Sequence, residues 1–409
     1  MRQWLDLLAI RDFRNLWISN TLVQVAQAAF PIAIAVVIID AGGSAAKLGG
    51  ILAARIAAST IFGLFGGVWA DRAKRKFVMI SADSFRGILI FSIAFLPAAT
   101  TPTLIYAVIV FLIGIGDSLG GPANNAILPT IIDDEKLQHA NVLRGITYRV
   151  SMILGPVIGG ILVALLVAQH AFLVIGAMYV IGTLLLLSIN EPPFERAGTR
   201  PTFLADLREG LKTVWEMPWV AALIAMASVQ LIFFLAIESV LLPVITKREF
   251  QTNSVMALAL AAFAVGGSIS SLVALKMKPK NPGRVAVLVW GLLVVGFISL
   301  AFPINKEFVI AAFFIAGFSI GPWDAFWPSA IQREVPMEKQ GRVFAIDQMG
   351  SLGLAPVGMA LVGPVTSITG ERNFILFSIA FHLFICAITL LVPGVAKLKN
   401  PSSAKSEQI

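Results

Sequence analysis

The sequence predicts an all-α membrane protein with twelve transmembrane helices in two pseudo-symmetric six-helix bundles. Hydrophobic residues make up 57% of the 409 residues and charged residues only 13%, about half of the charged share of an ordinary soluble domain. Apolar runs long enough to cross a hydrocarbon core of roughly 30 Å recur from Leu16 to Val392. These runs are continuous and do not alternate, which favours helices over an outer-membrane barrel.

Glycine, proline and charged clusters divide the apolar runs into six helices before a polar stretch and six after it. This predicts an N-terminal bundle at residues 1–190, a cytoplasmic linker at 191–217, and a C-terminal bundle with a short tail at 218–409. The predicted spans are 14–40, 45–70, 77–97, 103–131, 138–167, 169–190, 218–246, 253–275, 284–302, 308–332, 341–368 and 373–393.

The net charge of +8 reflects membrane topology and not nucleic-acid binding, because the basic residues lie in short loops between apolar runs. Most of the 31 lysines and arginines fall on the side that holds both termini and the linker. By the positive-inside rule both termini are then cytoplasmic. The single cysteine, Cys386, excludes an internal disulfide.

The loop between the second and third spans carries the first family signature, Gly67-Val68-Trp69-Ala70-Asp71-Arg72-Ala73-Lys74-Arg75-Lys76. It resembles the Gly-x-Leu-Ala-Asp-Arg-x-Gly-Arg-Arg loop of the major facilitator superfamily, with Trp69 in place of leucine and Lys74 in place of the second glycine. The resemblance implies a cytoplasmic gate in which Gly67, Asp71, Arg72 and Arg75 take part. Plain positive-inside anchoring would explain the basic residues, but neither the glycine nor the aspartate.

The fifth span contains Ser151-Met152-Ile153-Leu154-Gly155-Pro156-Val157-Ile158-Gly159-Gly160. This stretch resembles the Gly-x-x-x-Gly-Pro-x-x-Gly-Gly motif of the superfamily's antiporters, with Ser151 at the first glycine. Gly155, Pro156, Gly159 and Gly160 would allow close helix approach and a bend, and we expect a tight hinge against the other half. Glycine and proline are common in membrane helices anyway, which is the alternative explanation.

The chain as a whole resembles the bacterial branch of multidrug, macrolide and siderophore exporters. That resemblance implies a transporter of the bacterial inner membrane that exports small amphipathic molecules in exchange for protons, and acts as a monomer without a cofactor or metal. Ala26-Gln27 stands where many members have Gly-Asp, and Asp117 stands where many proton antiporters have an arginine. Neither usual coupling residue is therefore present.

Ionisable residues within the spans are candidate functional groups, since each costs about 2.5 to 3.5 kcal/mol in hydrocarbon. Glu238, deep in the seventh span, is the predicted proton carrier, with a structural hydrogen bond between helices as the alternative. Asp324 is the second candidate. Asp117 is a third, unless it forms a static pair with Arg149.

Two further pairings are expected from depth alone. Asp347 and Arg86 lie nearer the cytoplasmic side, where gate salt bridges with the Asp71 loop are expected. Arg55 and Asp40 lie nearer the outer end, where a salt bridge would seal the exit.

The resemblance also implies that spans 1, 4, 7 and 10 line a central cavity. Trp323, Phe326 and Trp327 share one helix face at spacings of three and four residues, which suits flat lipophilic ligands, although an interfacial aromatic belt has the same spacing. The predicted substrate-binding residues are Gln24, Gln27, Asn124, Phe233, Phe234, Trp323, Phe326 and Trp327.

Other classes of protein are less favoured by the sequence. It contains no His-Glu-x-x-His or Gly-x-Ser-x-Gly motif and no Walker loop, so neither an enzyme nor direct ATP-driven transport is predicted. Alternatives within transport are a dedicated exporter of an endogenous siderophore or lipid. A membrane scaffold or sensor is the alternative outside transport.

Overall fold

A computed structural model describes residues 2–70, 74–192 and 203–396. The chain divides into two compact units, Met1–Thr199 and Arg200–Ile409, called unit 1 and unit 2 below. Unit 1 contains α1 (Arg2–Ala9), α2 (Arg11–Asp40), α3 (Ala45–Ala70), α4 (Arg75–Ile93), α5 (Thr103–Ile131), α6 (Asp134–Leu165), a 3-10 turn (Ala168–His170) and α7 (Ala171–Leu187).

Unit 2 is also helical, but several of its spans are interrupted. Its elements are α8 (Phe203–Glu216), α9 (Pro218–Ala236), a π-helical turn (Ile237–Leu241), α10 (Leu242–Phe250), α11 (Ser254–Lys276), α12 (Pro282–Trp290), α13 (Leu293–Ala301), α14 (Lys306–Gly317), α15 (Ile320–Glu334), α16 (Met337–Gly353), α17 (Ala355–Thr369) and α18 (Glu371–Leu391).

Eleven helical segments of the described residues are long and apolar enough to cross a membrane. Helix α4 has the length but more charge, because any 18-residue window in it includes Lys76, Asp83 and Arg86. With α4 the spans number twelve, and the predicted all-α fold class is confirmed. Large apolar side chains such as Ile88, Leu104 and Leu165 are exposed on the outside of unit 1, as expected where helices contact lipid.

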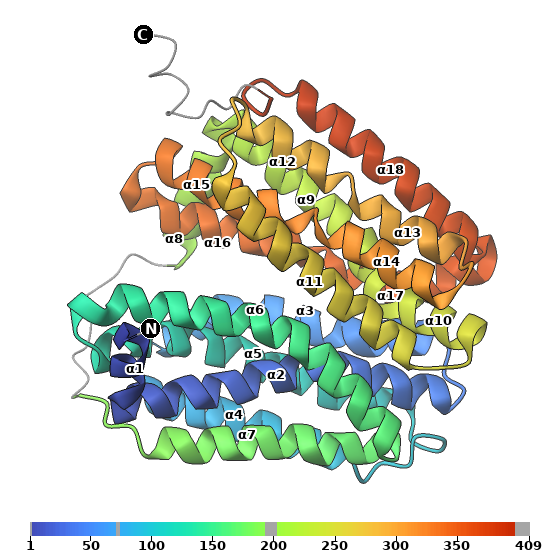
Figure 1. Cartoon of the computed structure of the whole chain (residues 1–409), viewed down its shortest axis with the longest axis horizontal. Coiled ribbons are helices and arrows are strands. Elements are labelled where there is room, and N and C mark those ends of the chain that lie inside the picture. Colours follow the sequence, from blue (N-terminus) through green and yellow to red (C-terminus); the bar gives the residue numbers. More distant parts are fainter. Residues whose placement is uncertain (1, 71–73, 193–202, 397–409) are drawn as a thin grey trace. The chain divides into compact units, whose positions relative to one another are not determined.

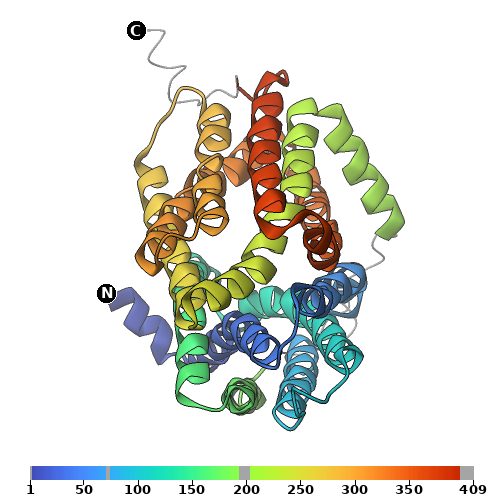
Figure 2. The same cartoon turned by 90° about the vertical axis from the view of Figure 1, so that its right-hand side faces the viewer.

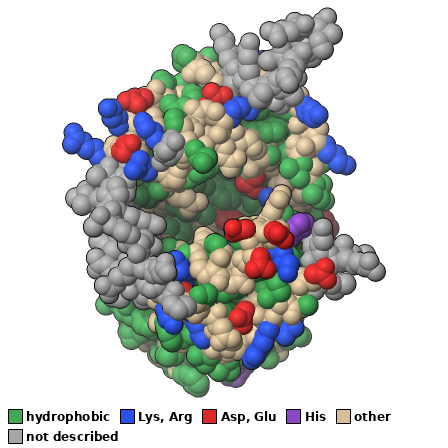
Figure 3. All heavy atoms as spheres, turned by 90° about the vertical axis from the view of Figure 1, so that its left-hand side faces the viewer, with side chains coloured by type: hydrophobic (Ala, Val, Ile, Leu, Met, Phe, Trp, Pro, Cys, Tyr) green, Lys and Arg blue, Asp and Glu red, His purple; other side chains and the backbone are tan. Residues whose placement is uncertain are grey.

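Helix α5 lies between α3 and α4 in unit 1, and α7 lies between α2 and α4 (Figure 1). In Figure 2 the helices of unit 1, coloured blue to green, are seen close to end-on as a bundle. Helix α2 is the most buried span, because it packs against both α6 and α7. Charged side chains gather on the face of the molecule shown in Figure 3.

The predicted linker, 191–217, is not simply an extended connection, because it contains helix α8, which packs against α16. The bundle boundaries at 190 and 218 remain predictions.

Proline explains two of the interruptions in unit 2. Pro322 has no N–H to bond the carbonyl of Phe318 four residues earlier. The helix is interrupted at that point, between α14 and α15. The Ser270 hydroxyl donates to the freed Phe318 oxygen at 2.6 Å. Pro243 likewise cannot bond Ser239, and the preceding turn widens so that the Leu242 N–H bonds to the Ile237 carbonyl.

Two glycines of the antiporter-like motif, Gly155 and Gly159, pack α6 against α2 within unit 1. The predicted hinge against the other half remains a prediction. A Cβ atom at Gly155 would lie 2.3 Å from the Ala28 Cβ, and one at Gly159 would lie 2.9 Å from the Ala29 oxygen. These glycines therefore permit a close helix pair inside the unit.

A Gly155→Ala substitution should consequently lower stability by about 1 to 3 kcal/mol, because α6 must move away from α2. Gly145→Ala is the matched control on the same helix, since a Cβ at Gly145 meets nothing within 4 Å. We expect the control to be neutral or slightly stabilising. Thermal unfolding of the purified chain in detergent measures both, and equal melting temperatures would contradict this packing.

Candidate functional site

A cluster of four charged side chains lies inside unit 1. Asp117 of α5 accepts a hydrogen bond from Arg55 Nε at 2.8 Å through Oδ2 and another from an Arg86 terminal nitrogen at 2.8 Å through Oδ1. Arg86 also pairs with Asp83, one turn earlier on α4. The Arg86 and Asp83 side chains are only 4% and 6% exposed. Each charge is thus neutralised within the cluster, as burial requires.

Glycines of α5 make room for the arginine side chains. A Cβ at Gly116 would lie 2.5 Å from Arg86 Cγ, and one at Gly120 would lie 3.1 Å from an Arg86 terminal nitrogen. Gly114 faces the backbone of α3, where a Cβ would lie 2.2 Å from the Arg55 carbonyl oxygen. Glycines on two sides of α5 therefore allow α3 and α4 each to bring an arginine to Asp117.

Aromatic rings cover the outer sides of these two arginines. The Arg86 guanidinium carbon lies 5.0 Å from the centre of the Tyr179 ring, and that of Arg55 lies 5.2 Å from the centre of the Phe30 ring. Cation–π contacts of this kind stabilise a desolvated guanidinium.

These pairings correct three sequence-based expectations. Asp117 pairs with Arg55 and Arg86 and not with Arg149, which lies at an exposed position of α6. Arg55 pairs with Asp117 and not with Asp40. Arg86 forms its salt bridges with Asp83 and Asp117, where a salt bridge with the Asp71 loop was predicted.

The cluster borders a cavity of about 320 Å³ inside unit 1. Three of the predicted substrate-binding residues, Gln24, Gln27 and Asn124, line it. Gln27 donates weakly to Asp117 at 3.4 Å, and Asn124 accepts from Asn20 at 2.8 Å. The Gln24 side-chain oxygen is buried and has no hydrogen-bond partner among the described residues. The other lining residues are Asn20, Val23, Arg55, Met79, Asp83, Arg86, Asp117, Gly120, Gly121 and Tyr148.

Only part of the signature loop is described. Gly67 lies near the end of α3, and Asp71 and Arg72 lie outside the described residues. Arg75 begins α4, and the Glu191 carboxylate accepts from the backbone N–H groups of Arg75 and Lys76 at 3.0 and 2.9 Å. The Lys76 ammonium in turn donates to the carbonyls of Leu187 and Ile189 at the end of α7. Each helix end is thus paired with the charge that its dipole favours.

Glu238 lies on the π-helical turn between α9 and α10. It is half-buried, and no basic side chain forms an ion pair with it in the described part of the chain. Single π-helical turns inside membrane and soluble helices are frequent at functional sites. The other candidate carrier, Asp324, lies at an exposed position of α15.

Asp347 of α16 is bonded by neutral donors. Trp327 Nε1 donates to it at 2.9 Å and the Ser351 hydroxyl donates at 3.2 Å. The Trp327 ring stacks on Trp323 with 5.7 Å between centroids and meets Trp219 edge-on at 5.9 Å. Asp347 therefore holds the orientation of the indole at the centre of this aromatic group.

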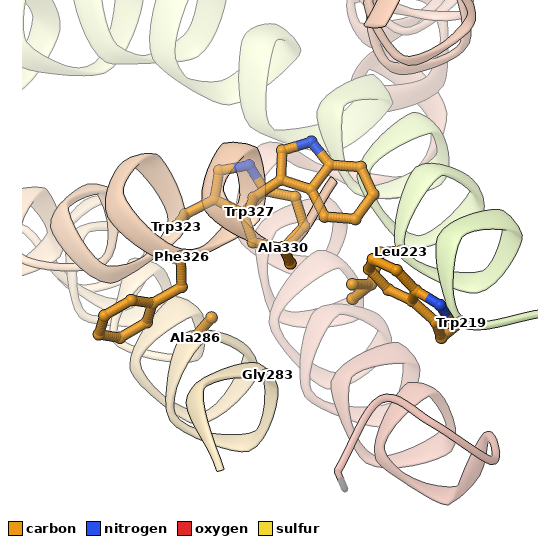
Figure 4. Close-up of a pocket in the computed structure, with 8 residues that line it drawn as sticks. All are labelled: Trp219, Leu223, Gly283, Ala286, Trp323, Phe326, Trp327 and Ala330. Atoms are coloured by element: carbon orange, nitrogen blue, oxygen red, sulfur yellow. The ribbon is translucent and has the colours of Figure 1, made fainter. Parts of the chain in front are cut away.

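Figure 4 shows Trp219 and Leu223 of α9 facing Trp327, with Phe326 beside Ala286 of α12. The space that these residues enclose is about 10 Å³, about enough for one water molecule. In this structure the aromatic side chains pack on one another and leave no room for a ligand between them.

The two predicted phenylalanines of α9 are also engaged in packing. Phe233 contacts Phe374, Phe377 and Phe381 of α18, with centroids 5.2 to 5.9 Å away. Phe234 contacts Phe263 of α11 and Phe297 of α13. Both rings lie within the helix packing of unit 2.

The sequence did not indicate three contacts of the site. These are Asp83 with Arg86, Arg55 with Asp117, and Glu191 with the start of α4. Asp83 and Arg86 are three residues apart on one helix, a spacing that favours an ion pair and could have been recognised. The contacts of Arg55 and Glu191 join segments distant in sequence, and depth in the membrane did not indicate them.

Breaking the ion pair at Asp117 should destabilise unit 1. We expect Asp117→Asn and Arg55→Gln each to lower the unfolding free energy by about 3 kcal/mol. The first leaves the Arg55 guanidinium without a carboxylate, and the second leaves the buried cluster with one uncompensated negative charge. The double variant should be about 1 to 3 kcal/mol more stable than the sum of the two effects. Denaturation in detergent measures this coupling, with exposed Asp133→Asn as a control, and additive effects would exclude the pair.

Comparison with known proteins identifies the family. The model of the Major Facilitator Superfamily matches residues 16–355. The chain is 27% identical over 311 residues to "Multidrug efflux pump Tap" of Mycolicibacterium fortuitum, covering 71% of this chain and 73% of that protein. It is 23% identical over 397 residues to "Macrolide efflux protein A" of Streptococcus pyogenes, covering 94% and 97%.

Solved structures show the same fold at low sequence identity. The nucleoside transporter NupG aligns with a TM-score of 0.72 at 11% identity, covering 92% of this chain and 98% of that one. A POT family transporter in complex with 5-aminolevulinic acid aligns with a TM-score of 0.73 at 14% identity, covering 95% and 97%. The match of the family model over most of the sequence, together with the twelve-helix fold, places this chain in the Major Facilitator Superfamily.

Proposed function

We propose that this protein is a secondary active transporter that exports small amphipathic molecules in exchange for protons. Its relatives include proteins named as multidrug and macrolide efflux pumps, which supports an efflux role. The fold supports alternating access, in which two helical repeats rock around a central site. We further propose that it works as a monomer, without a cofactor, in the inner membrane of a bacterium, with both termini in the cytoplasm.

The observation that carries proton coupling is the environment of Glu238. Its carboxyl group lies within an apolar span, on a π-helical turn, and has no ionic partner among the described residues. An unpaired carboxylate is costly in hydrocarbon, so the group favours its protonated form when water is excluded. When water reaches the carboxyl group, hydration stabilises its charged form. A carrier has to alternate between these two states.

Asp117 is a poorer carrier than Glu238. Two arginines hold its carboxylate, so protonation would leave a guanidinium unpaired. We therefore propose a structural role for Asp117 and keep Asp324 as the second candidate carrier.

Substrate contact is proposed at the unit 1 cavity, through Gln24, Gln27 and Asn124. Its volume of about 320 Å³ falls at the lower end of the range for small-molecule sites. The aromatic group around Trp323, Phe326 and Trp327 would contribute only after its rings separate, because it encloses so little space.

The polarity of this cavity favours one alternative, a dedicated exporter of an endogenous siderophore, over an exporter of purely lipophilic compounds. A lipid exporter has the same fold but less use for a cavity lined by charges and amides. A non-transporting scaffold would not need a polar cavity.

The test is efflux of a fluorescent amphipathic xanthene dye from proteoliposomes, with and without an imposed pH gradient. We expect gradient-driven efflux by the natural chain, and for Glu238→Gln only a slow rate that ignores the gradient. Glu307→Gln is the matched control, because Glu307 is exposed at the start of α14. Undiminished gradient dependence in Glu238→Gln would remove Glu238 from the mechanism.

A further inference from the structure

The unit 1 cavity has balanced charges on its own lining. Arg55 and Arg86 supply two positive charges, and Asp83 and Asp117 supply two negative charges that pair with them. This group is neutral as a whole and therefore gives the cavity no net preference for an anion or a cation.

Arg144 of α6 adds a positive charge at the edge of this cavity. One of its terminal nitrogens donates to the side-chain oxygens of Asn124 and Asn125, each at 3.2 Å. Amide oxygens satisfy hydrogen bonds but do not neutralise a charge. Throughout the described ranges, Arg144 forms no ion pair with a carboxylate.

Two neighbours connect Arg144 to the cavity. Asn124, to which it is bonded, lines the cavity, and so does Tyr148, one turn further along α6. The guanidinium thus lies beside the wall formed by α5 and α6. Only one of its nitrogens is bonded to the asparagines, and its remaining N–H groups donate to no described residue.

The cavity also offers hydrogen-bonding groups away from Arg144. The buried Gln24 side-chain oxygen lines the cavity and accepts no hydrogen bond from any described residue. A ligand that donates to this oxygen and presents an anion to Arg144 would satisfy both groups at once.

We propose that Arg144 binds a carboxylate of the transported molecule, so that the unit 1 cavity selects amphipathic molecules bearing one carboxylate. A single unneutralised arginine matches a monoanion, and its planar donor fork matches the geometry of a carboxylate. This inference rests on the proposed function and narrows its substrate class from amphipathic molecules in general to amphipathic carboxylates.

The test is equilibrium binding of two dyes to the purified full-length chain in detergent, read by fluorescence anisotropy at one pH and with no gradient. One dye is a xanthene with a free carboxylate, and the other is its ethyl ester with the same ring system. We expect the natural chain to bind the carboxylate about tenfold more tightly than the ester. Equal binding, tighter binding of the ester, or no binding of either dye would overturn the inference.

Variants identify the residue that is responsible. Arg144→Gln should abolish the preference for the carboxylate dye, and Arg144→Lys should keep part of it because the charge remains. Lys136→Gln, which removes a positive charge from the exposed first turn of the same helix, should keep the full preference. A preference that persists in Arg144→Gln would show that another group binds the carboxylate.

The result is separable from proton coupling. A chain that fails the efflux test but prefers the carboxylate dye would contradict the proposed function alone. A chain that passes the efflux test without this preference would contradict only the inference about Arg144.

Discussion

Inside unit 1, one carboxylate of α5 is held between an arginine of α3 and an arginine of α4. A buried charge without a partner would destabilise the bundle, so the three ion-paired side chains constrain how α3, α4 and α5 pack. Glycines at 114, 116 and 120 on α5 provide the space for the arginines and for the close approach of α3. Two of the charged residues that distinguish α4 from the other spans, Asp83 and Arg86, belong to the same cluster.

In unit 2, the carboxyl groups of Asp347 and Glu238 are not held by arginines. Asp347 is bonded by Trp327 and Ser351, which are neutral, and Glu238 lies on a widened helical turn with no ionic partner among the described residues. A carboxyl group without a fixed positive partner can change its protonation state at less cost than one held by two arginines. On our proposal, unit 1 supplies a polar cavity, while unit 2 supplies the group that carries the proton.

The fold was predictable because long apolar runs leave a membrane chain few alternatives to helices. The predicted spans 45–70 and 103–131 coincide with α3 and α5, which glycine, proline and charge delimit clearly. The contents of the site were predictable only in kind. Their position within apolar spans identified Asp117, Arg86 and Glu238 as candidate functional residues. The sequence alone did not indicate that Arg55 pairs with Asp117. Such partners depend on which helices pack together and at what height, and periodicity determines neither.

Proton exchange is tested most directly by observing the proton itself. The chain would be reconstituted into vesicles that contain a trapped pH-sensitive dye, at equal pH inside and outside, and substrate would then be added outside. Exchange predicts that substrate entering down its gradient drives protons out, so that the vesicle interior becomes alkaline. Substrate entry with no change in internal pH, or with acidification, would contradict proton antiport.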